Sequence, residues 1–411
     1  MNERILISGA SIAGLTVAYW LARHGFHPTV VERQRGVRTG GNGVDVRGQA
    51  VDVVERMGIM GQVRAAATDV QGMKFVDESD RAVARIDTTG ASEVEIMRGD
   101  LVALLKAATD PGVAYVFGDS VRHLESDGDG VTVDFEHGER RRFDLVIGAD
   151  GLHSTVRRLA FGPEARYVRH KNHYFAFADA DATFGENRWM TIYNPPGKLA
   201  GIYRSGNHDQ AKAYFVFRSG PMAYDHHDIE QHKRIVEEAF AADTSWRIKE
   251  LLATAMTDEE FYFDALSQVH MDSWCSGRVA LVGDAAWCAS PVSGAGAELA
   301  LTGAYRLAGE LAAASGDHRI AFSAYQDSHR DLVRRRQQID TNLRLMVPRT
   351  AGGRRVRNTL ARLPLMQAMG AVERAVPARR RPLPQYGGNR MTVPPAATAP
   401  ADCPHTTKPG V

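Results

Sequence analysis

The stretch "GASIAGLTVAYWLARHGFHPTVVER", residues 9–33, decides the fold of this chain. It follows a short apolar segment, "RILIS" at residues 4–8, and apolar side chains then recur at helical spacing. The segment "HPTVVER" at residues 27–33 predicts a second strand. A strand, a helix and a strand in this order predict a βαβ unit with parallel strands, and therefore an α/β fold.

The turn between the first strand and the helix indicates a dinucleotide site. Gly9 allows the tight bend, Gly14 lets the helix pack close to the sheet, and Ser11 takes the place of the middle glycine of a GxGxxG turn. Because a serine hydroxyl can bind a phosphate oxygen, we expect a pyrophosphate at the helix N-terminus. Glu32 ends the second strand, where a carboxylate accepts from ribose hydroxyls, which favours FAD or NAD(H) over NADP(H). The alternative is a glycine-rich turn in another α/β fold.

Two later segments have the same form, a buried strand that ends in glycine-rich sequence. "LVIGADGLHSTVRR" at residues 145–158 places Asp150 either in a binding site or as a helix cap. "GRVALVGDAAWCASPVSGAGAELAL" at residues 277–301 brings Asp284 to the C-terminal end of a strand, where open α/β sheets bind ligands. The loop at residues 291–296 can present backbone N–H groups to an electron-rich ring edge. An ordinary loop is the alternative.

Composition excludes several classes of protein. The chain has 411 residues, 44% of them hydrophobic, 24% charged, and a net charge of +1, so we expect two domains and no general attraction to nucleic acid or membrane. Its three cysteines form no CxxC pair, which argues against a disulfide framework or a zinc site. No apolar run has the length of a signal-peptide core or a membrane span, so we expect a cytoplasmic protein.

These motifs, in this order, resemble those of the group A flavoprotein monooxygenases, the single-component FAD hydroxylases of the p-hydroxybenzoate hydroxylase fold. "GGNGVDVRGQA" at residues 40–50 and "IMRGDLVALL" at residues 96–105 most resemble the tetracycline-inactivating and antibiotic-tailoring members. The resemblance implies FAD as cofactor and NADPH or NADH as co-substrate. It also implies that a C4a-hydroperoxyflavin inserts one oxygen atom of O2 into an aromatic or polyketide-like molecule. No catalytic side chain is expected, because the flavin performs the chemistry.

The resemblance assigns individual roles. Asp45 would contact the flavin, Arg98 would reach the cofactor, and Asp284 would bind the ribityl chain. Arg38 would contact the nicotinamide cofactor, and Asp150 the pyrophosphate or NAD(P)H. The full set of expected cofactor-binding residues is Gly9, Ser11, Ala13, Gly14, Glu32, Arg33, Arg38, Asp45, Arg47, Arg98, Asp150, Asp284, Pro291, Gly294, Ala295 and Gly296. The chain departs from the family pattern at Ser11, at Trp287, where histidine is common, and at Glu298, where asparagine is common.

The sequence pattern, together with the resemblance, predicts the domain organisation. Residues 1–164 and 273–320 would form the Rossmann-like FAD-binding domain, and residues 165–272, where aromatic and polar residues alternate, a mostly antiparallel substrate-binding sheet. Residues 321–380 would form bridging helices, and residues 381–411 a disordered tail.

Aromatic residues of the second sheet are the candidates for the substrate pocket: Tyr174, Phe175, Phe177, Trp189, Tyr193, Tyr203, Phe215 and Phe217. We select Phe177, Trp189, Tyr203 and Phe215, although strand alternation directs half or more of the candidates into a core. His173, His226 and His227 could act as bases on a phenol, but solvated or structural histidines are the favoured interpretation. We expect no metal.

Other functions and partners remain open at this point. The same fold could serve a reductase or dehydrogenase, or a flavin-bearing protein that only sequesters its ligand. We expect O2 and a small molecule as partners, no nucleic acid or membrane, and a monomer or homodimer. The arginine-rich residues 330–390 could form a membrane-surface or nucleic-acid patch. We favour helices with outward arginines, joined to both domains through Leu343, Leu345, Met346, Leu360, Leu363 and Met366.

Overall fold

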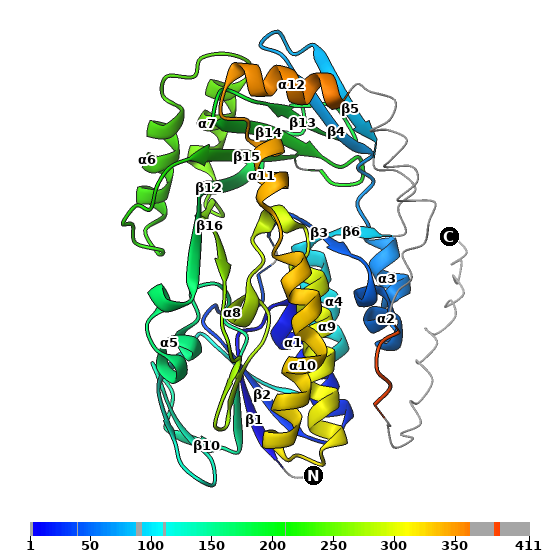
Figure 1. Ribbon diagram of the computed structural model, residues 1–411, viewed down its shortest axis with the longest axis vertical. Helices are drawn as coiled ribbons and strands as arrows, with labels where there is room; N and C mark the ends of the chain where they lie inside the picture. The colour runs from blue at the N-terminus through cyan, green and yellow to red at the C-terminus, as the bar shows by residue number, and fades with distance from the viewer. Residues whose placement is uncertain are drawn as a thin grey trace, which may run out of the picture.

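The computed structural model describes residues 3–38, 40–87, 93–109, 112–209, 211–361 and 382–386. It contains two large sheets, which lie toward opposite ends of the long axis of the molecule (Figure 1). A small pair of strands, β3 (Gly43–Val46) and β6 (Val94–Met97), lies between them. The predicted α/β fold, with a parallel cofactor sheet and a mostly antiparallel second sheet, is confirmed.

The first sheet has six strands in the order β17-β18-β11-β1-β2-β7. All of its pairs are parallel except β17 with β18, so the C-terminal ends of β1, β2, β11 and β18 meet at one edge. This is the edge at which such sheets bind ligands. The bounds are β1 Arg4–Ser8, β2 His27–Glu32, β7 Ala114–Phe117, β11 Leu145–Gly148, β17 Cys275–Ser276 and β18 Val279–Leu281.

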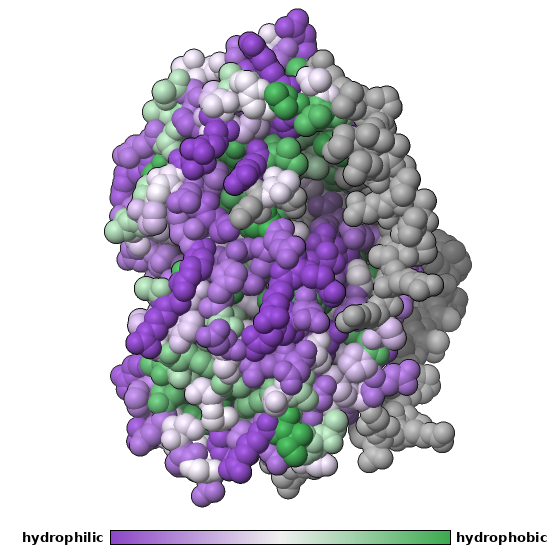
Figure 2. Space-filling view, in the orientation of Figure 1, coloured by the Kyte–Doolittle hydropathy of each residue, from purple (hydrophilic) through white to green (hydrophobic). Residues whose placement is uncertain are grey.

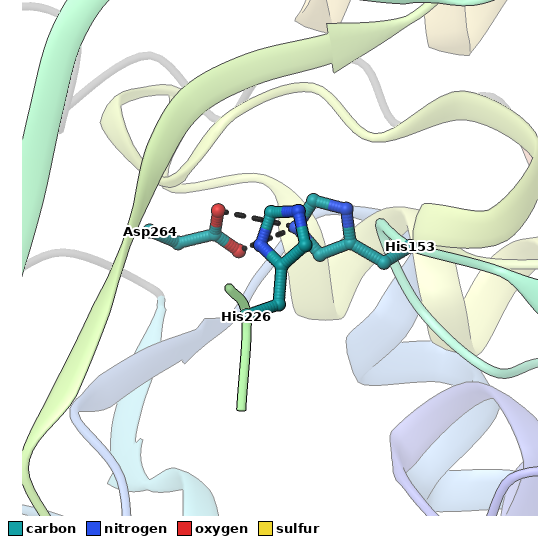
Figure 3. A group of neighbouring side chains, drawn as sticks. All are labelled: His153, His226 and Asp264. Carbon is teal, nitrogen blue, oxygen red and sulfur yellow. Dashed lines mark hydrogen bonds and ion pairs between the residues drawn. The ribbon is translucent and has the colours of Figure 1, made fainter. Parts of the chain in front are cut away.

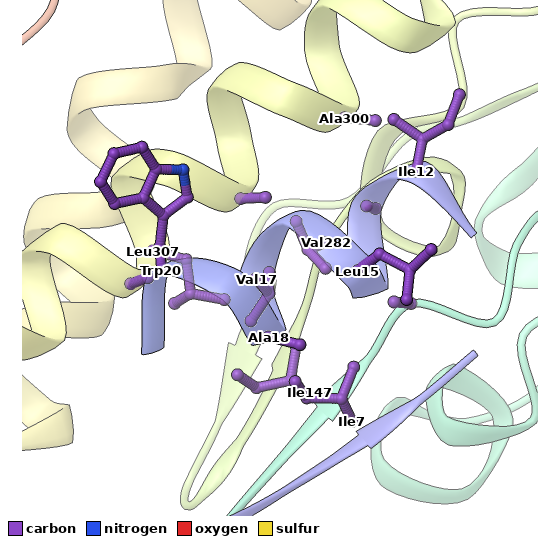
Figure 4. Packing of buried hydrophobic residues seen from close by; sticks show 14 of the residues in the cluster. Ile7, Ile12, Leu15, Val17, Ala18, Trp20, Ile147, Val282, Ala300 and Leu307 are labelled. Atoms are coloured by element: carbon purple, nitrogen blue, oxygen red, sulfur yellow. The ribbon is translucent and has the colours of Figure 1, made fainter. Parts of the chain in front are cut away.

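Helix α1 (Ile12–Arg23) lies between this sheet and helix α9 (Gly296–Ala313), as Figure 4 shows. Its Leu15 and Ala18 are fully buried near Ile7 and Ile147 of the sheet. Each fully buried leucine or isoleucine contributes about 1.5–3 kcal/mol. Both glycines of the turn are required, because a Cβ on Gly9 (φ +106°) would lie 2.5 Å from the Ala149 oxygen and one on Gly14 would overlap the Gly9 oxygen. The turn therefore holds α1 tightly against the sheet edge.

The second sheet has seven strands in the order β16-β12-β15-β14-β13-β4-β5, and only the β13–β4 pair is parallel. Helices α6 (Ile229–Phe240) and α7 (Ile248–Thr257) cover one face. The strand bounds are β4 Gly72–Val76, β5 Ala82–Asp87, β12 Val168–Ala180, β13 Trp189–Tyr193, β14 Lys198–Arg204, β15 Ala211–Arg218 and β16 Tyr262–Val269.

The remaining elements surround the two sheets. A three-stranded sheet comprises β8 Val121–Ser126, β9 Val131–Phe135 and β10 Arg141–Phe143. The other helices are α2 Gln49–Arg56, α3 Met60–Ala65, α4 Arg98–Thr109, α5 Thr155–Phe161, α8 Asp284–Trp287, α10 His318–Arg336, α11 Asp340–Met346 and α12 Ala351–Ala361, with 3-10 turns η1 Glu164–Arg166 and η2 Pro291–Ser293. Within the described ranges, no helix combines the length and the apolar character that a membrane crossing requires.

Two segments differ from the predicted boundaries. Residues 72–87, expected in the first domain, form β4 and β5 and pair with β13 in the second sheet, in the register Trp189↔Gly72. This pairing is long-range, and the strand pattern of the segment does not specify which sheet it joins. At the other end, residues 382–386 of the expected disordered tail lie against α9, where Leu383 is buried and Tyr386 Oη donates to Glu310 at 2.8 Å. The rest of that tail lies outside the described residues.

The C-terminal helices combine an apolar inner face with an arginine-rich surface. Figure 2 shows mainly hydrophilic residues over α10, whose last turn carries three arginines, while its Phe322 and Tyr325 are buried. Among the expected bridging residues, Leu343 is buried and Met346 packs against the second sheet. Leu345 and Leu360 are 44% and 43% exposed, so for them the prediction was wrong. Leu363 and Met366 lie outside the described residues.

Candidate cofactor and substrate site

The parallel sheet brings four motifs to one edge. The 9–14 turn follows β1, Glu32 ends β2, Asp150 follows β11, and Asp284 follows β18. Glu32 already holds the turn, because its Oε2 accepts from the Ala10 N–H at 2.8 Å. These four segments therefore cluster as predicted, because the four strands that precede them run in the same direction.

The N-terminus of α1 forms an anion-binding arrangement. Ser11 is the N-cap residue, yet its hydroxyl makes no capping bond and instead accepts from Arg98 Nη2 at 2.8 Å. The first turn of α1 holds no acidic residue, so the positive end of the helix dipole is not compensated. Desolvation lowers the pKa of Arg98, and Arg38 lowers it further, so two cationic groups lie near one another here. A pyrophosphate fits this combination of N–H groups, hydroxyl and guanidinium.

Asp150 has the contacts of a helix cap. One carboxylate oxygen accepts from the Ser154 hydroxyl and the other from the Val156 N–H at 3.0 Å. Burial raises the pKa of Asp150, although these hydrogen bonds oppose the rise. Both oxygens thus stabilise the start of α5, which favours the structural alternative over a direct contact with a cofactor.

Asp284 and the 291–296 loop lie on the side of the edge nearest α9. The Asp284 side chain remains accessible but lies deep among the surrounding elements, and this desolvation raises its pKa while Arg98 opposes the rise. Gly294 is left-handed (φ +56°), and a Cβ there would lie 3.2 Å from Asp45 Oδ2 on β3. Desolvation, with Glu95 and Glu298, raises the pKa of Asp45 to about 6. The loop and β3 therefore face each other closely.

The contacts of Glu298 account for one departure from the family pattern, namely the glutamate that stands where asparagine is common. Its side chain is buried, and its Oε2 lies 3.4 Å from Arg47 Nε and 2.8 Å from Arg336 Nε. Arg47 also donates from Nη2 to the Ser293 oxygen at 2.9 Å, so the pair fixes a guanidinium against the loop. An asparagine would leave both arginines without this counter-charge. The sequence drew attention to Glu298 but gave no indication of Arg336, its partner on α10.

Trp287, a further departure from the family pattern, is buried in the helix layer. Its ring is fully buried among Trp274, Tyr325 and His329, with ring centroids 4.6, 5.8 and 4.8 Å away. It packs under α10 and stabilises the helix layer. This departure from the family pattern therefore lies in the packing beneath α10.

Two arginines of the expected cofactor-binding set lie at the exposed margin of the sheet edge. Arg33 and Arg38 are exposed, and Arg33 Nη1 lies 3.3 Å from His227 Nε2 in the loop at residues 220–228. This contact joins the end of β2 to the second sheet's long loop. His173, another candidate base, is buried on β12, and its Nδ1 lies 2.8 Å from the Lys171 oxygen, as in a structural histidine.

The second sheet divides the aromatic candidates by face. Phe177 and Tyr203 share the face on which Val292 of η2 and Met97 of β6 pack, so they lie on the cofactor side. Phe215 is fully buried on the opposite face, 5.4 Å from the Phe240 ring of α6. Residues four apart on one strand point the same way, so Trp189 shares the α6 side with Tyr193. Phe215 and Trp189 were therefore wrongly selected for the substrate pocket.

Glu95 on β6 is a candidate site residue that the sequence analysis missed. It accepts from the Thr68 hydroxyl at 2.8 Å and lies beside the Tyr203 hydroxyl, and desolvation raises its pKa. In the β3–β6 register it stands directly opposite Asp45, which places both carboxyl groups on one face. An acidic residue in an otherwise apolar strand, "VEIM", was the signal that could have identified it.

Comparisons with known proteins agree with this geometry. Residues 3–334 match the family model described as FAD binding domain. The chain is 43% identical over 343 residues to an uncharacterized protein of Mycobacterium tuberculosis (strain ATCC 25618 / H37Rv), covering 82% of this chain and 92% of that protein. It is 38% identical over 337 residues to a flavin-dependent monooxygenase of Legionella longbeachae, covering 81% and 86%.

Solved structures are similar over almost the whole chain. The tetracycline destructase Tet(51) superimposes with a TM-score of 0.81 at 33% identity, covering 94% of this chain and 100% of that one. A salicylate hydroxylase superimposes with a TM-score of 0.65 at 19% identity, covering 92% and 99%, which shows a shared fold alone.

Proposed function

The chain belongs to the family of FAD-binding class A flavoprotein monooxygenases, and we propose that it oxygenates an aromatic or polyketide-like small molecule at the expense of NADPH or NADH. Bound FAD supplies the redox chemistry, namely acceptance of hydride from the nicotinamide and transfer of one oxygen atom from O2. One observation carries the proposal. The α1 N-terminus, Arg98 and Asp284 meet at one sheet edge, beneath an aromatic face of the second sheet.

The residues of the edge would bind the two halves of the cofactor. The uncompensated N-terminus of α1, with Ser11 and Arg98, suits the pyrophosphate. Glu32 would accept from the adenosine ribose, and Asp284, accessible at the end of β18, would accept from a hydroxyl of the ribityl chain.

The 291–296 loop would orient the isoalloxazine ring. Its backbone precedes α9, whose dipole places partial positive charge at the loop, and Arg47 adds a full positive charge held by Glu298. Positive charge at this position favours electron density on the neighbouring ring edge. This arrangement supports a role for Arg47 in stabilising the reduced cofactor.

The aromatic face would bind the substrate and exclude water. Phe177 and Tyr203, which are 8% and 6% exposed, would form part of its apolar lining, and Glu95 with Asp45 would provide acceptors at its border. A planar molecule with a hydrogen-bond donor at its edge matches this surface. The similarity to a tetracycline destructase gives the first substrates to test, although that substrate is a property of the relative.

The test is turnover of the purified protein with a substrate panel. NADPH and NADH oxidation and O2 uptake are followed with and without tetracyclines, aromatic polyketides and phenols. The proposal expects one class to accelerate both rates and to yield a product heavier by one oxygen atom. NAD(P)H-dependent turnover without O2 would identify a reductase. Ligand binding without any acceleration of NAD(P)H oxidation would identify a sequestering protein, and either result overturns the proposal.

A further inference from the structure

Three polar side chains outside the cofactor edge form a compact cluster. Figure 3 shows His153, His226 and Asp264, which come from the loop after β11, the loop at residues 220–228, and β16. One polar atom of each lies within 4.8 Å of the others. The cluster therefore joins the first sheet to two segments of the second.

His153 lies between two carboxylates. Its Nε2 is 3.2 Å from both oxygens of Asp264, and its Nδ1 is 3.1 and 3.3 Å from those of Glu164. An ionised carboxylate only accepts hydrogen bonds, so each ring nitrogen must donate. Both nitrogens donate only in the positively charged imidazolium form.

The geometry does not suit a metal ion. The rings of His153 and His226 lie against each other in a tilted arrangement, with centroids 3.7 Å apart and planes 33° from parallel. A metal ion needs ring nitrogens that are free to bind it, whereas both ring nitrogens of His153 already face carboxylates. Moreover, a metal would have to displace the Nε2 proton that faces Asp264.

Asp264 depends on this cation. Its side chain is buried, and its Oδ1 also accepts from the Tyr224 hydroxyl at 2.8 Å and from the Ala265 N–H at 2.7 Å, while Tyr262 Oη lies 3.4 Å from Oδ2. These groups are neutral. Loss of its cation destabilises a buried carboxylate far more than an exposed one.

The cluster is linked to the cofactor edge on both sides. Tyr262, two residues before Asp264 on β16, lies close enough to Arg98 and Asp284 for both to affect its pKa, after the dominant effect of desolvation. On the other side, Arg157 contacts Glu164 at 3.3 Å and donates to the Ala285 oxygen at 2.9 Å, next to Asp284. Contacts through β16 and through the start of α8 thus connect His153 to the surroundings of Arg98 and Asp284.

We propose that His153, as an imidazolium, is a positioning residue that ties β16 to the loop after β11 and so keeps the cofactor edge assembled beneath the second sheet. This inference rests on the proposed function only in that the edge binds FAD. The ionic bridge itself is a property of the protein without cofactor.

The bridge has a defined pH window. Desolvation alone would lower the pKa of His153, but Asp264 and Glu164 outweigh it and raise that pKa to about 9. The other groups facing it are His226, whose pKa desolvation and His153 lower, and Arg157 beyond Glu164. A histidine with a raised pKa contributes stability that is complete below its ordinary value of 6.5 and is lost as pH rises through about 9. We therefore expect the bridge to be formed at pH 7 and largely lost at pH 10.

The experiment compares wild type with His153→Gln at pH 7 and pH 10. Thermal unfolding is measured without FAD, and the FAD dissociation constant by flavin fluorescence. At pH 7 we expect His153→Gln to have a lower Tm than wild type and an FAD dissociation constant about tenfold higher, a loss of about 1.4 kcal/mol in binding free energy. At pH 10 both gaps should shrink, because the wild type has lost the same charge. His123→Gln, an exposed histidine on β8, is the control and should match wild type at both pH values.

A second variant keeps the test decisive. His153→Gln with Asp264→Asn removes both charges but keeps polar groups, and should recover most of the Tm and FAD affinity lost in His153→Gln. Gaps of equal size at pH 7 and pH 10, or none at pH 7, overturn the proposal. Stoichiometric Zn²⁺ binding that His226→Gln abolishes would overturn it in favour of a metal site. A wild type that never binds FAD refutes the proposed function, while the unfolding measurement still tests the bridge.

Discussion

Arg98 Nη2 donates a 2.8 Å hydrogen bond to the hydroxyl of Ser11, the residue that replaces the middle glycine of the dinucleotide turn. A glycine offers no such acceptor. The serine therefore holds the guanidinium of α4 at the N-terminus of α1, where the helix dipole already favours an anion. The serine that departs from GxGxxG therefore provides a hydrogen-bond acceptor that fixes the Arg98 guanidinium beside the N-terminus of α1.

Restoring the family-typical glycine should weaken cofactor binding. In Ser11→Gly, Arg98 loses its acceptor, and we expect an FAD dissociation constant about fivefold higher, because a hydrogen bond contributes about 1 kcal/mol. Fluorescence titration of the apoprotein measures this. Ser79→Gly, at an exposed turn, serves as the matched control. Equal or tighter binding by Ser11→Gly would contradict the role given to the hydroxyl.

Glu298→Gln should destabilise the protein. The buried carboxylate has two arginine partners, Arg47 and Arg336, so its neutralisation should cost about 2–3 kcal/mol. The free energy of unfolding in urea is the measurement. Glu55→Gln breaks an exposed pair with Arg64 and should cost under about 0.5 kcal/mol. Similar losses in the two variants would show that burial of Glu298 is unimportant.

The two faces of the second sheet predict opposite effects for two phenylalanines. Phe215 lies in the core under α6. Phe215→Leu should therefore lower the free energy of unfolding by about 1–2 kcal/mol and leave the substrate KM unchanged. Phe177 lies on the cofactor side, so Phe177→Leu should raise the substrate KM severalfold with a smaller loss of stability. Unfolding curves and steady-state kinetics of both variants provide the comparison. A raised KM in Phe215→Leu alone would reverse our assignment of the faces.

Replacement of Asp45 by asparagine should stabilise the protein in a pH-dependent way. The pKa of Asp45 is raised to about 6, so the folded protein carries a penalty that begins above the ordinary value of 3.8 and is complete above about 6. Asp45→Asn should therefore stabilise the apoprotein by about 1–2 kcal/mol at pH 7.5 and by almost nothing at pH 4. Unfolding free energies at both pH values test this. The exposed Asp129→Asn should show no such difference, and a gain in Asp45→Asn that is the same at pH 4 would refute the cause.

The sequence by itself determined the βαβ unit and the edge at which the motifs gather. Gly9 and Gly14 have one physical use at a strand-to-helix turn, and parallel strands place their C-terminal ends together wherever they lie in the chain. Asp284 and the 291–296 loop could therefore be grouped with the 9–14 turn from the sequence alone, whereas Asp45, which lies on the antiparallel β3–β6 pair, was assigned to the site only by the family resemblance.

Only the tertiary structure decided which side chains face one another across elements. Phe177 on β12 and Phe215 on β15 lie on opposite faces because the register pairs Phe215 with Ala176, and a spacing argument within one strand does not give that register. Which face meets the cofactor edge depends in turn on the helices that cover the other face. The pairs Glu298–Arg336 and His153–Asp264 are likewise invisible to spacing arguments, since they join segments that meet only when the sheets and helices have packed. Local pattern specifies elements and their ends, whereas ionic partners across the core are specified by packing alone.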